Sequence, residues 1–176
     1  LPLHPSALYY NHAWGAVMML GLAWPEKVFA GLLFHELGHR LRHLTEKAPS
    51  ALAPPGSSLH TQEELDMHAL EDAVFDAATE GKYGKYIEAF IAKNRRVRNV
   101  YQLISRLTLD DLHALDALLG CERCGPSIAR LLAAQYLVSV GTRYLAATVE
   151  PARQSEKSIK LYQWYIGQFT AQGYGK

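Results

Sequence analysis

Apolar residues recur every three or four positions along most of the chain, the spacing that places them on one face of an α-helix. The clearest run covers residues 25–44 and opens with a proline and a glutamate, both suited to the first turn of a helix. A proline- and serine-rich loop follows at 48–58, and a second helical run covers 61–79. Further helices are expected at 86–98 merging into 100–107, at 109–119, at 126–147 and at 156–170.

The apolar positions of the first two helices predict which faces are buried. In the first helix these positions are Val28, Leu32, Leu33, Leu37 and Leu41. In the second helix they include Leu65, Ala69, Val74 and Ala77. Because the proline-rich loop must turn the chain back, we expect one face of the second helix to pack against the first.

The N-terminal segment has a different pattern. Residues 7–10 and 16–20 flank Asn11 and His12, which suit a turn, and the segment is rich in β-favouring side chains. A short hairpin is therefore expected, with a helix through 13–22 as the alternative. The predicted fold class is α+β and mostly helical, with this small N-terminal β-hairpin beside the first helix and a C-terminal helical bundle.

The composition is that of an ordinary globular protein, with 49% hydrophobic residues, 20% charged residues and a net charge of +1. So small a net charge gives no overall attraction to nucleic acid or to an anionic membrane, and neither is expected as the main partner. The most apolar stretch, 13–24, is too short to cross a bilayer. The chain has only two cysteines, Cys121 and Cys124, which favours a reducing, cytoplasmic setting.

One motif with a chemical meaning lies inside the first helix. His35-Glu36-Leu37-Gly38-His39 is the HExxH pattern. The four-residue spacing stacks His35 and His39 one turn apart on one helix face, so both imidazoles can bind one zinc ion. Glu36 then flanks the metal and can accept a proton from the attacking water. The alternative is an amphipathic helix that carries these residues on its solvated side by chance.

A catalytic zinc ion takes three protein ligands and keeps one position for water, so a third ligand is needed. The helix at 61–79 offers Glu64, His68, Glu71, Asp72 and Asp76. We choose Glu71, because its apolar neighbours Leu70, Ala73 and Val74 indicate a carboxylate that points inward from a packed helix. His68, Asp72 and Glu64 stay open as alternatives, as does an exposed acidic helix with no ligand at all.

The run from Phe34 to His43 resembles the active-site helix of the zincin metallopeptidases, and His43 is similar to the extra histidine of the ImmA/IrrE-like branch. The resemblance covers residues 7–78. It implies a strand that leads into the metal helix and a downstream glutamate ligand, for which Glu71 stands. It also implies zinc as cofactor and a protein or peptide, such as a regulatory protein, as substrate. On this basis residues 1–80 form the zincin-like catalytic part and residues 81–176 a helical bundle packed on it, as one compact unit.

A second resemblance indicates another class of enzyme. Residues 29–33, followed by a histidine–acid pair, look like the HD phosphohydrolases, which are all-helical, metal-dependent enzymes that act on nucleotides. His12, His35 and Asp110 or Asp111 would fill the places of the metal-binding residues. However, Glu36 stands where that family has aspartate. A third hypothesis is a helical interaction domain with a structural metal site.

Two further segments hold reactive or charged side chains. Cys121 and Cys124 have the CxxC spacing of a redox pair or half a zinc site, and His113 lies nearby in the sequence. We interpret the two cysteines as turn residues without a function. Residues 93–98 contain one lysine and three arginines close to Tyr101, and a solvated helix face explains them as well as contact with phosphate does.

Overall fold

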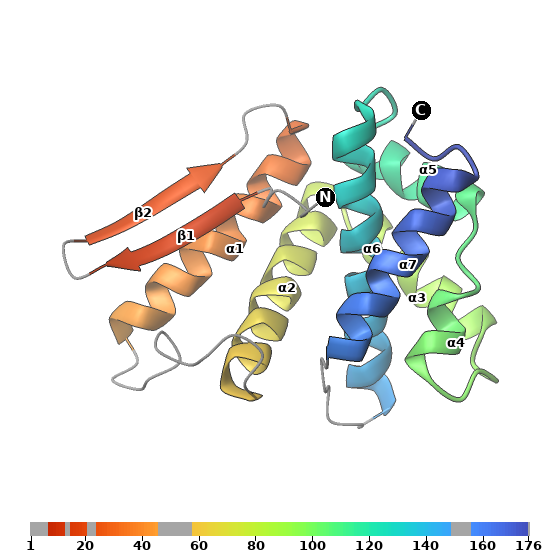
Figure 1. Ribbon diagram of the computed structural model, residues 1–176, viewed down its shortest axis with the longest axis horizontal. Coiled ribbons are helices and arrows are strands. Elements are labelled where there is room, and N and C mark those ends of the chain that lie inside the picture. Colours follow the sequence, from red (N-terminus) through yellow and green to blue (C-terminus); the bar gives the residue numbers. More distant parts are fainter. Residues whose placement is uncertain (1–6, 13–14, 21–23, 46–57, 149–155, 176) are drawn as a thin grey trace.

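The computed structural model describes residues 7–12, 15–20, 24–45, 58–148 and 156–175, and Figure 1 shows how they are arranged. Seven helices lie within these ranges. They are α1 (Glu26–Thr45), α2 (Ser58–Ala78), α3 (Lys82–Lys93), α4 (Val100–Ile104), α5 (Leu109–Leu119), α6 (Pro126–Thr148) and α7 (Glu156–Ala171). The helices α1, α5, α6 and α7 begin and end within one residue of the expected positions.

The single long helix expected to merge 86–98 with 100–107 is wrong. The helix α3 begins at Lys82, directly after Gly81, whose φ of 76° is the left-handed conformation that glycine adopts without strain. A turn then separates α3 from the short helix α4, and the side chain of Asn99 caps α4 by accepting a hydrogen bond from the backbone N–H of Gln102. Asn94 thus ends α3 and Asn99 begins α4, although the apolar periodicity continues through the turn between them.

The predicted α+β fold class is wrong, and the fold is all-helical. Every side chain of the described core belongs to a helix or to a turn next to one. The strands β1 (Ala7–His12) and β2 (Gly15–Leu20) pair only with each other, antiparallel, with Ala7 opposite Leu20. This ribbon lies against α1 at the edge of the molecule (Figure 1). Two strands do not make a sheet layer on which helices could pack, and an α+β fold needs such a layer.

The core is built around α6, which contacts α2, α3, α4, α5 and α7. It extends from Val28 on α1 through Phe75 on α2 into the helices that follow residue 80. The disulfide between Cys121 and Cys124 closes the turn between α5 and α6, a pairing that we did not predict from the sequence. Within the described residues, no helix has the combination of length and apolar character that crossing a membrane requires.

The buried faces of α1 and α2 agree with the sequence prediction only in part. Val28 and Leu32 on α1 and Leu65 on α2 are buried, as expected. Leu37 and Leu41 are 42% and 63% exposed, and Ala69 and Ala77 on α2 are also exposed. After Leu32, the buried residues of α1 are polar, namely His35, Glu36 and His39. The histidine face is buried because α2 presents carboxylates to it, as described below.

Two glycines allow α1 and α2 to approach closely. A Cβ atom at Gly31 would overlap the ring of Phe75, and one at Gly38 would overlap the sulfur of Met67. The two glycines are seven residues apart, which places them two turns apart on the same side of α1. His35 lies between them along the helix, so the close approach also brings this imidazole near the side chains of α2.

We predict that Gly31→Ala destabilises the protein. The added methyl group must displace the fully buried ring of Phe75, and overpacking of this kind lowers the free energy of unfolding by about 1–3 kcal/mol. The matched control is Gly167→Ala in α7, where a Cβ atom meets nothing within 4 Å, so helix propensity alone should raise stability by about 0.5–1 kcal/mol. Urea unfolding measures both. An increase in both variants would show that α1 and α2 are not in close contact at Gly31.

Candidate metal centre

The side chains of the HExxH motif lie at the interface between α1 and α2. His35, Glu36 and His39 are all buried on the face of α1 that looks toward α2. The two imidazoles are one helical turn apart, and their Nε2 atoms are 3.3 Å from each other. Two ring nitrogens this close need either a proton or a cation between them, because both cannot present a lone pair to the other.

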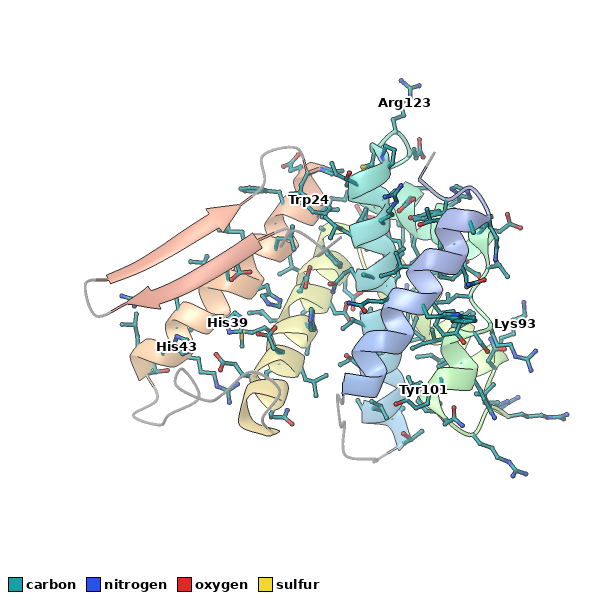
Figure 2. All side chains as sticks on the ribbon, in the orientation of Figure 1. Trp24, His39, His43, Lys93, Tyr101 and Arg123 are labelled. Carbon is teal, nitrogen blue, oxygen red and sulfur yellow. A yellow bond between two sulfur atoms is a disulfide. The ribbon has the colours of Figure 1, made fainter. Side chains whose placement is uncertain are left out.

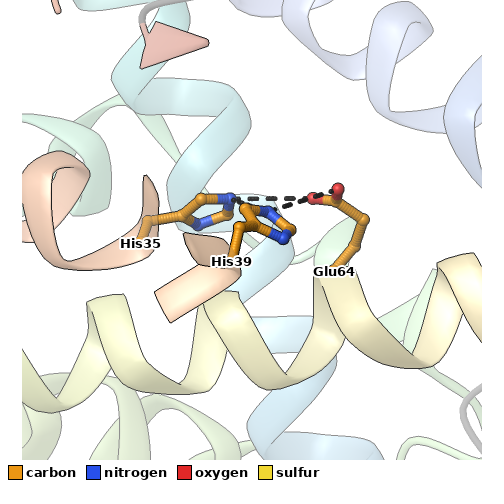
Figure 3. Close-up of side chains that lie close together, drawn as sticks. All are labelled: His35, His39 and Glu64. Atoms are coloured by element: carbon orange, nitrogen blue, oxygen red, sulfur yellow. Dashed lines mark hydrogen bonds and ion pairs between the residues drawn. The ribbon is translucent and has the colours of Figure 1, made fainter. Parts of the chain in front are cut away.

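Glu64 on α2 completes a group of three ligand atoms. Its Oε2 atom is 3.7 Å from Nε2 of His35, and its Oε1 atom is 3.5 Å from Nε2 of His39. Figure 3 shows the two imidazoles of α1 and the carboxylate of α2 converging on one point. One ligand atom from each of the three residues lies within 4.8 Å of the others. The Glu64 side chain is 30% exposed, so the group is reached by solvent on this side.

The opposite nitrogen of each imidazole faces a second carboxylate. Nδ1 of His39 is 2.9 Å from Oε1 of Glu63, and Nδ1 of His35 is 3.3 Å from Oε2 of Glu71. Both glutamates are buried on α2. For His39, the Glu63 carboxylate keeps the proton on Nδ1 and leaves the Nε2 lone pair available to a metal. Nδ1 of His35 is within ion-pair distance of Glu71 but makes no hydrogen bond among the described atoms. His39 therefore has the outer hydrogen bond that zinc-binding histidines usually have.

Two more histidines extend the cluster. Nε2 of His43 is 3.0 Å from the same oxygen of Glu63, and Nδ1 of His68 is 3.3 Å from Oε2 of Glu71. His35, His68 and Glu71 form a second group of possible ligands, which shares His35 with the first. The side chain of Gln135 on α6 lies 3.5 Å from Nδ1 of His68.

The charges of the cluster shift the titration of its members. Burial alone lowers the pKa of His35, but Glu64 and Glu71 outweigh it and raise the pKa to about 10. Burial alone raises the pKa of Glu64, but His35 and His39 outweigh it and hold the pKa at about 2. The pKa of Glu36 is raised, mainly by burial. Without a metal, a proton on His35 therefore supplies the positive charge that the carboxylates require.

The donor set fits a divalent cation of the zinc type. Imidazole nitrogen together with carboxylate oxygen is a common zinc-ligand combination. Glu71 is only 1% exposed, yet its Oε1 atom has no hydrogen-bond partner among the described atoms. The other oxygen, Oε2, contacts His35 and His68. A buried carboxylate oxygen without a hydrogen bond is costly, and a nearby cation would offset that cost.

The structure places the residues expected from the sequence as follows. His35, Glu36 and His39 are brought together, whereas Glu71 contacts the outer nitrogen of His35 and does not form a three-residue group with both histidines. The third ligand of the first group is Glu64, which we kept only as an alternative. The sequence feature that could have identified Glu64 is its spacing from His68 and Glu71, which places the three residues on one face of α2.

Two further metal-ligand candidates from the sequence, Asp72 and Asp111, have other partners. Asp72 accepts hydrogen bonds from Ser139 and Arg143 of α6. Asp111, proposed for the phosphohydrolase arrangement, caps the N-terminus of α5 through Thr108 and accepts a hydrogen bond from Tyr86. Within the described residues, neither aspartate joins a group of metal-binding side chains.

Comparisons with known proteins add no identification. No protein-family model, no curated protein and no solved structure matches the chain. The resemblance to the zincin metallopeptidases therefore rests on the motif and its flanking residues. The function has to be inferred from the chemistry of the cluster itself.

We predict a pH dependence of stability in the metal-free protein. The pKa of His35 is raised from 6.5 to about 10 in the folded chain, so its contribution is fully present below pH 6.5 and is lost as the pH rises through about 10. In a chelator-containing buffer, the melting temperature should fall over this window, and His35→Gln should flatten the fall. His113→Gln, an exposed histidine on α5, is the control and should keep it. Identical pH profiles for His35→Gln and the parent would contradict this assignment.

Proposed function

We propose that this chain is a zinc-dependent metallopeptidase and that His35, His39 and Glu64 hold the zinc ion. One observation carries the proposal: two Nε2 atoms and a carboxylate converge, while the Nδ1 atom of each histidine faces a buried glutamate. When bound, zinc supplies the Lewis-acid chemistry that polarises a carbonyl group and makes water nucleophilic near neutral pH. A regulatory protein as substrate belongs to the same proposal.

Glu36 is proposed as the general base. It lies in the middle of α1, next to His35, and it is buried with the cluster. Burial raises its pKa, which makes the carboxylate a better proton acceptor than an exposed glutamate. Its role is to take a proton from water and return it to the leaving amine, without binding the metal itself.

Glu63 and Glu71 are proposed as positioning residues. Glu63 is hydrogen-bonded to Nδ1 of His39, and Glu71 lies within ion-pair distance of Nδ1 of His35. Both carboxylates are buried, so neither is displaced easily by water. Glu71 was our choice of third ligand from the sequence. Its position beside Nδ1 of His35 supports a positioning role better, because zinc held by His35 and His39 lies on the Nε2 side.

The first test is Glu36→Gln. This variant should bind one equivalent of zinc, as the parent does, but should lose peptide cleavage by at least about 100-fold, the lower range for removal of a general base. Metal content by mass spectrometry and cleavage of a quenched fluorescent peptide library give the two readouts. Glu26→Gln, an exposed glutamate on the same helix, is the control and should keep both properties. Loss of zinc in Glu36→Gln would contradict a base that is not a ligand.

The second test separates Glu64 from Glu71. Loss of a positioning carboxylate lowers metal affinity by about 10- to 100-fold, and loss of a direct ligand should lower it further. Zinc affinity, measured by competition with a chelating dye, should therefore fall more in Glu64→Gln than in Glu71→Gln. The visible spectrum of the cobalt-substituted protein should change shape only in Glu64→Gln. The reverse order would restore Glu71 as the third ligand.

A further inference from the structure

The second group of possible metal ligands lies directly beside the proposed zinc site. His35 of α1 and His68 and Glu71 of α2 each offer one ligand atom, and these atoms lie within 4.8 Å of one another. In Figure 2, His39 marks the place where α1 and α2 face each other, and the second group lies in the same interface. The His35 ring presents Nε2 toward His39 and Nδ1 toward Glu71. One imidazole therefore has a nitrogen for each group.

Two buried atoms of the second group lack hydrogen-bond partners. Among the described atoms, Nδ1 of His35 and Oε1 of Glu71 make no hydrogen bond. His35 is 8% exposed and Glu71 is 1% exposed, so water does not readily hydrate either atom. Buried polar atoms usually have a partner, and a bound ion is one explanation of an exception. Two such atoms on adjacent side chains of one ligand group indicate a place for a cation.

The distances between the ligand atoms suit a tetrahedral ion. Oε2 of Glu71 is 3.3 Å from Nδ1 of His35 and 3.3 Å from Nδ1 of His68. Two ligands that each lie about 2.0–2.1 Å from a tetrahedral zinc ion are about 3.3–3.4 Å apart. Because Nδ1 of His35 makes no hydrogen bond at this short distance, Oε2 lies off the direction of its lone pair. Two ligands of one ion have this arrangement, since the ion occupies the lone-pair direction.

The second group can be reached from solvent and has a further polar neighbour. The His68 side chain is 20% exposed, whereas that of Glu71 is almost fully buried. An ion can therefore approach from the side of His68. The amide group of Gln135 on α6 is 3.5 Å from Nδ1 of His68, and its oxygen can serve as an additional ligand if the amide group is turned over.

One zinc ion does not balance the charge of the whole cluster. Glu63, Glu64 and Glu71 each contact one or more of the histidines, and when ionised they carry one more negative charge than a zinc ion neutralises. Glu71 does not belong to the first ligand group, so an ion in that group does not contact it. A buried carboxylate without a contacting cation is costly, and an ion in the second group would lie beside Glu71.

We propose that His35, His68 and Glu71 bind a second zinc ion, so that the His35 ring bridges two ions through Nε2 and Nδ1. This inference rests on the zinc site proposed above. The second ion displaces the proton on Nδ1 of His35, and this proton passes to the buffer. A neutral imidazole gives up its proton less readily than a charged one, so the second ion binds more weakly and a chelator removes it first. With the first ion alone, Glu71 keeps its positioning role.

Isothermal titration calorimetry with zinc tests the second site in the metal-free protein. The parent should bind two equivalents, and the heat of the second step should vary with the ionisation heat of the buffer, as release of one proton requires. His68→Gln should keep the first step and weaken the second at least about 100-fold, because losing a direct ligand costs more than losing a carboxylate that positions one. His113→Gln, an exposed histidine on α5, is the control and should keep both steps. Circular dichroism checks folding.

His39→Gln separates this inference from the proposed zinc site. The variant loses a ligand of the first group only, so it should keep one ion on the second group. A parent that binds one ion, lost in His39→Gln but kept in His68→Gln, would overturn the second site and leave the proposed zinc site intact. A parent that binds one ion, kept in His39→Gln but lost in His68→Gln, would contradict both.

Copper distinguishes a bridge from a second ion bound elsewhere. Cu²⁺ takes imidazole ligands at least as well as zinc does, and two Cu²⁺ ions that share one deprotonated imidazole ring are magnetically coupled. The electron paramagnetic resonance signal of the parent should therefore grow during the first equivalent of Cu²⁺ and shrink during the second. In His68→Gln the signal should not shrink. A parent signal that doubles with the second equivalent would show two separate ions and overturn the bridge.

Discussion

The need to neutralise buried carboxylates between α1 and α2 is the constraint on which the rest of this structure depends. Glu63 and Glu71 are almost fully buried, and Glu36 lies in the same interface. Removing such groups from water is costly unless hydrogen bonds or positive charges replace the lost hydration. The imidazoles of α1 supply hydrogen-bond partners and, when protonated, charge. A bound zinc ion would supply positive charge without requiring any histidine to be protonated.

The other helices hold α2 in the orientation that this cluster requires. Ser139 and Arg143 of α6 both donate hydrogen bonds to Asp72, and Arg143 also pairs with Asp76. These contacts fix α2 against the central helix of the fold. The face of α2 that carries Glu64 and Glu71 therefore points toward α1, where Gly31 and Gly38 permit a close approach of the two helices. The helices of the second half thus contribute to the geometry of the site without providing any of its proposed ligands.

The sequence predicted the helix that carries the candidate site better than the packing around it. The positions of His35, Glu36 and His39 on one helix followed from the motif and the apolar period, and the helix is present. The exposure of Leu37 and Leu41 did not follow, because the period identifies an apolar face but not which face a polar cluster will bury. The choice between Glu64 and Glu71 depends on how α2 is rotated against α1. That rotation is set by contacts with α6 that lie far away in the sequence.

The most direct test of this account is X-ray absorption at the zinc edge of the zinc-loaded protein. The account predicts a first shell with two imidazole nitrogens at about 2.0–2.1 Å and carboxylate oxygen at about 2.0–2.2 Å, because Glu64 joins the two Nε2 atoms. A protein that keeps no zinc after gel filtration, or a first shell without imidazole, would contradict the claim that the cluster between α1 and α2 is a metal centre.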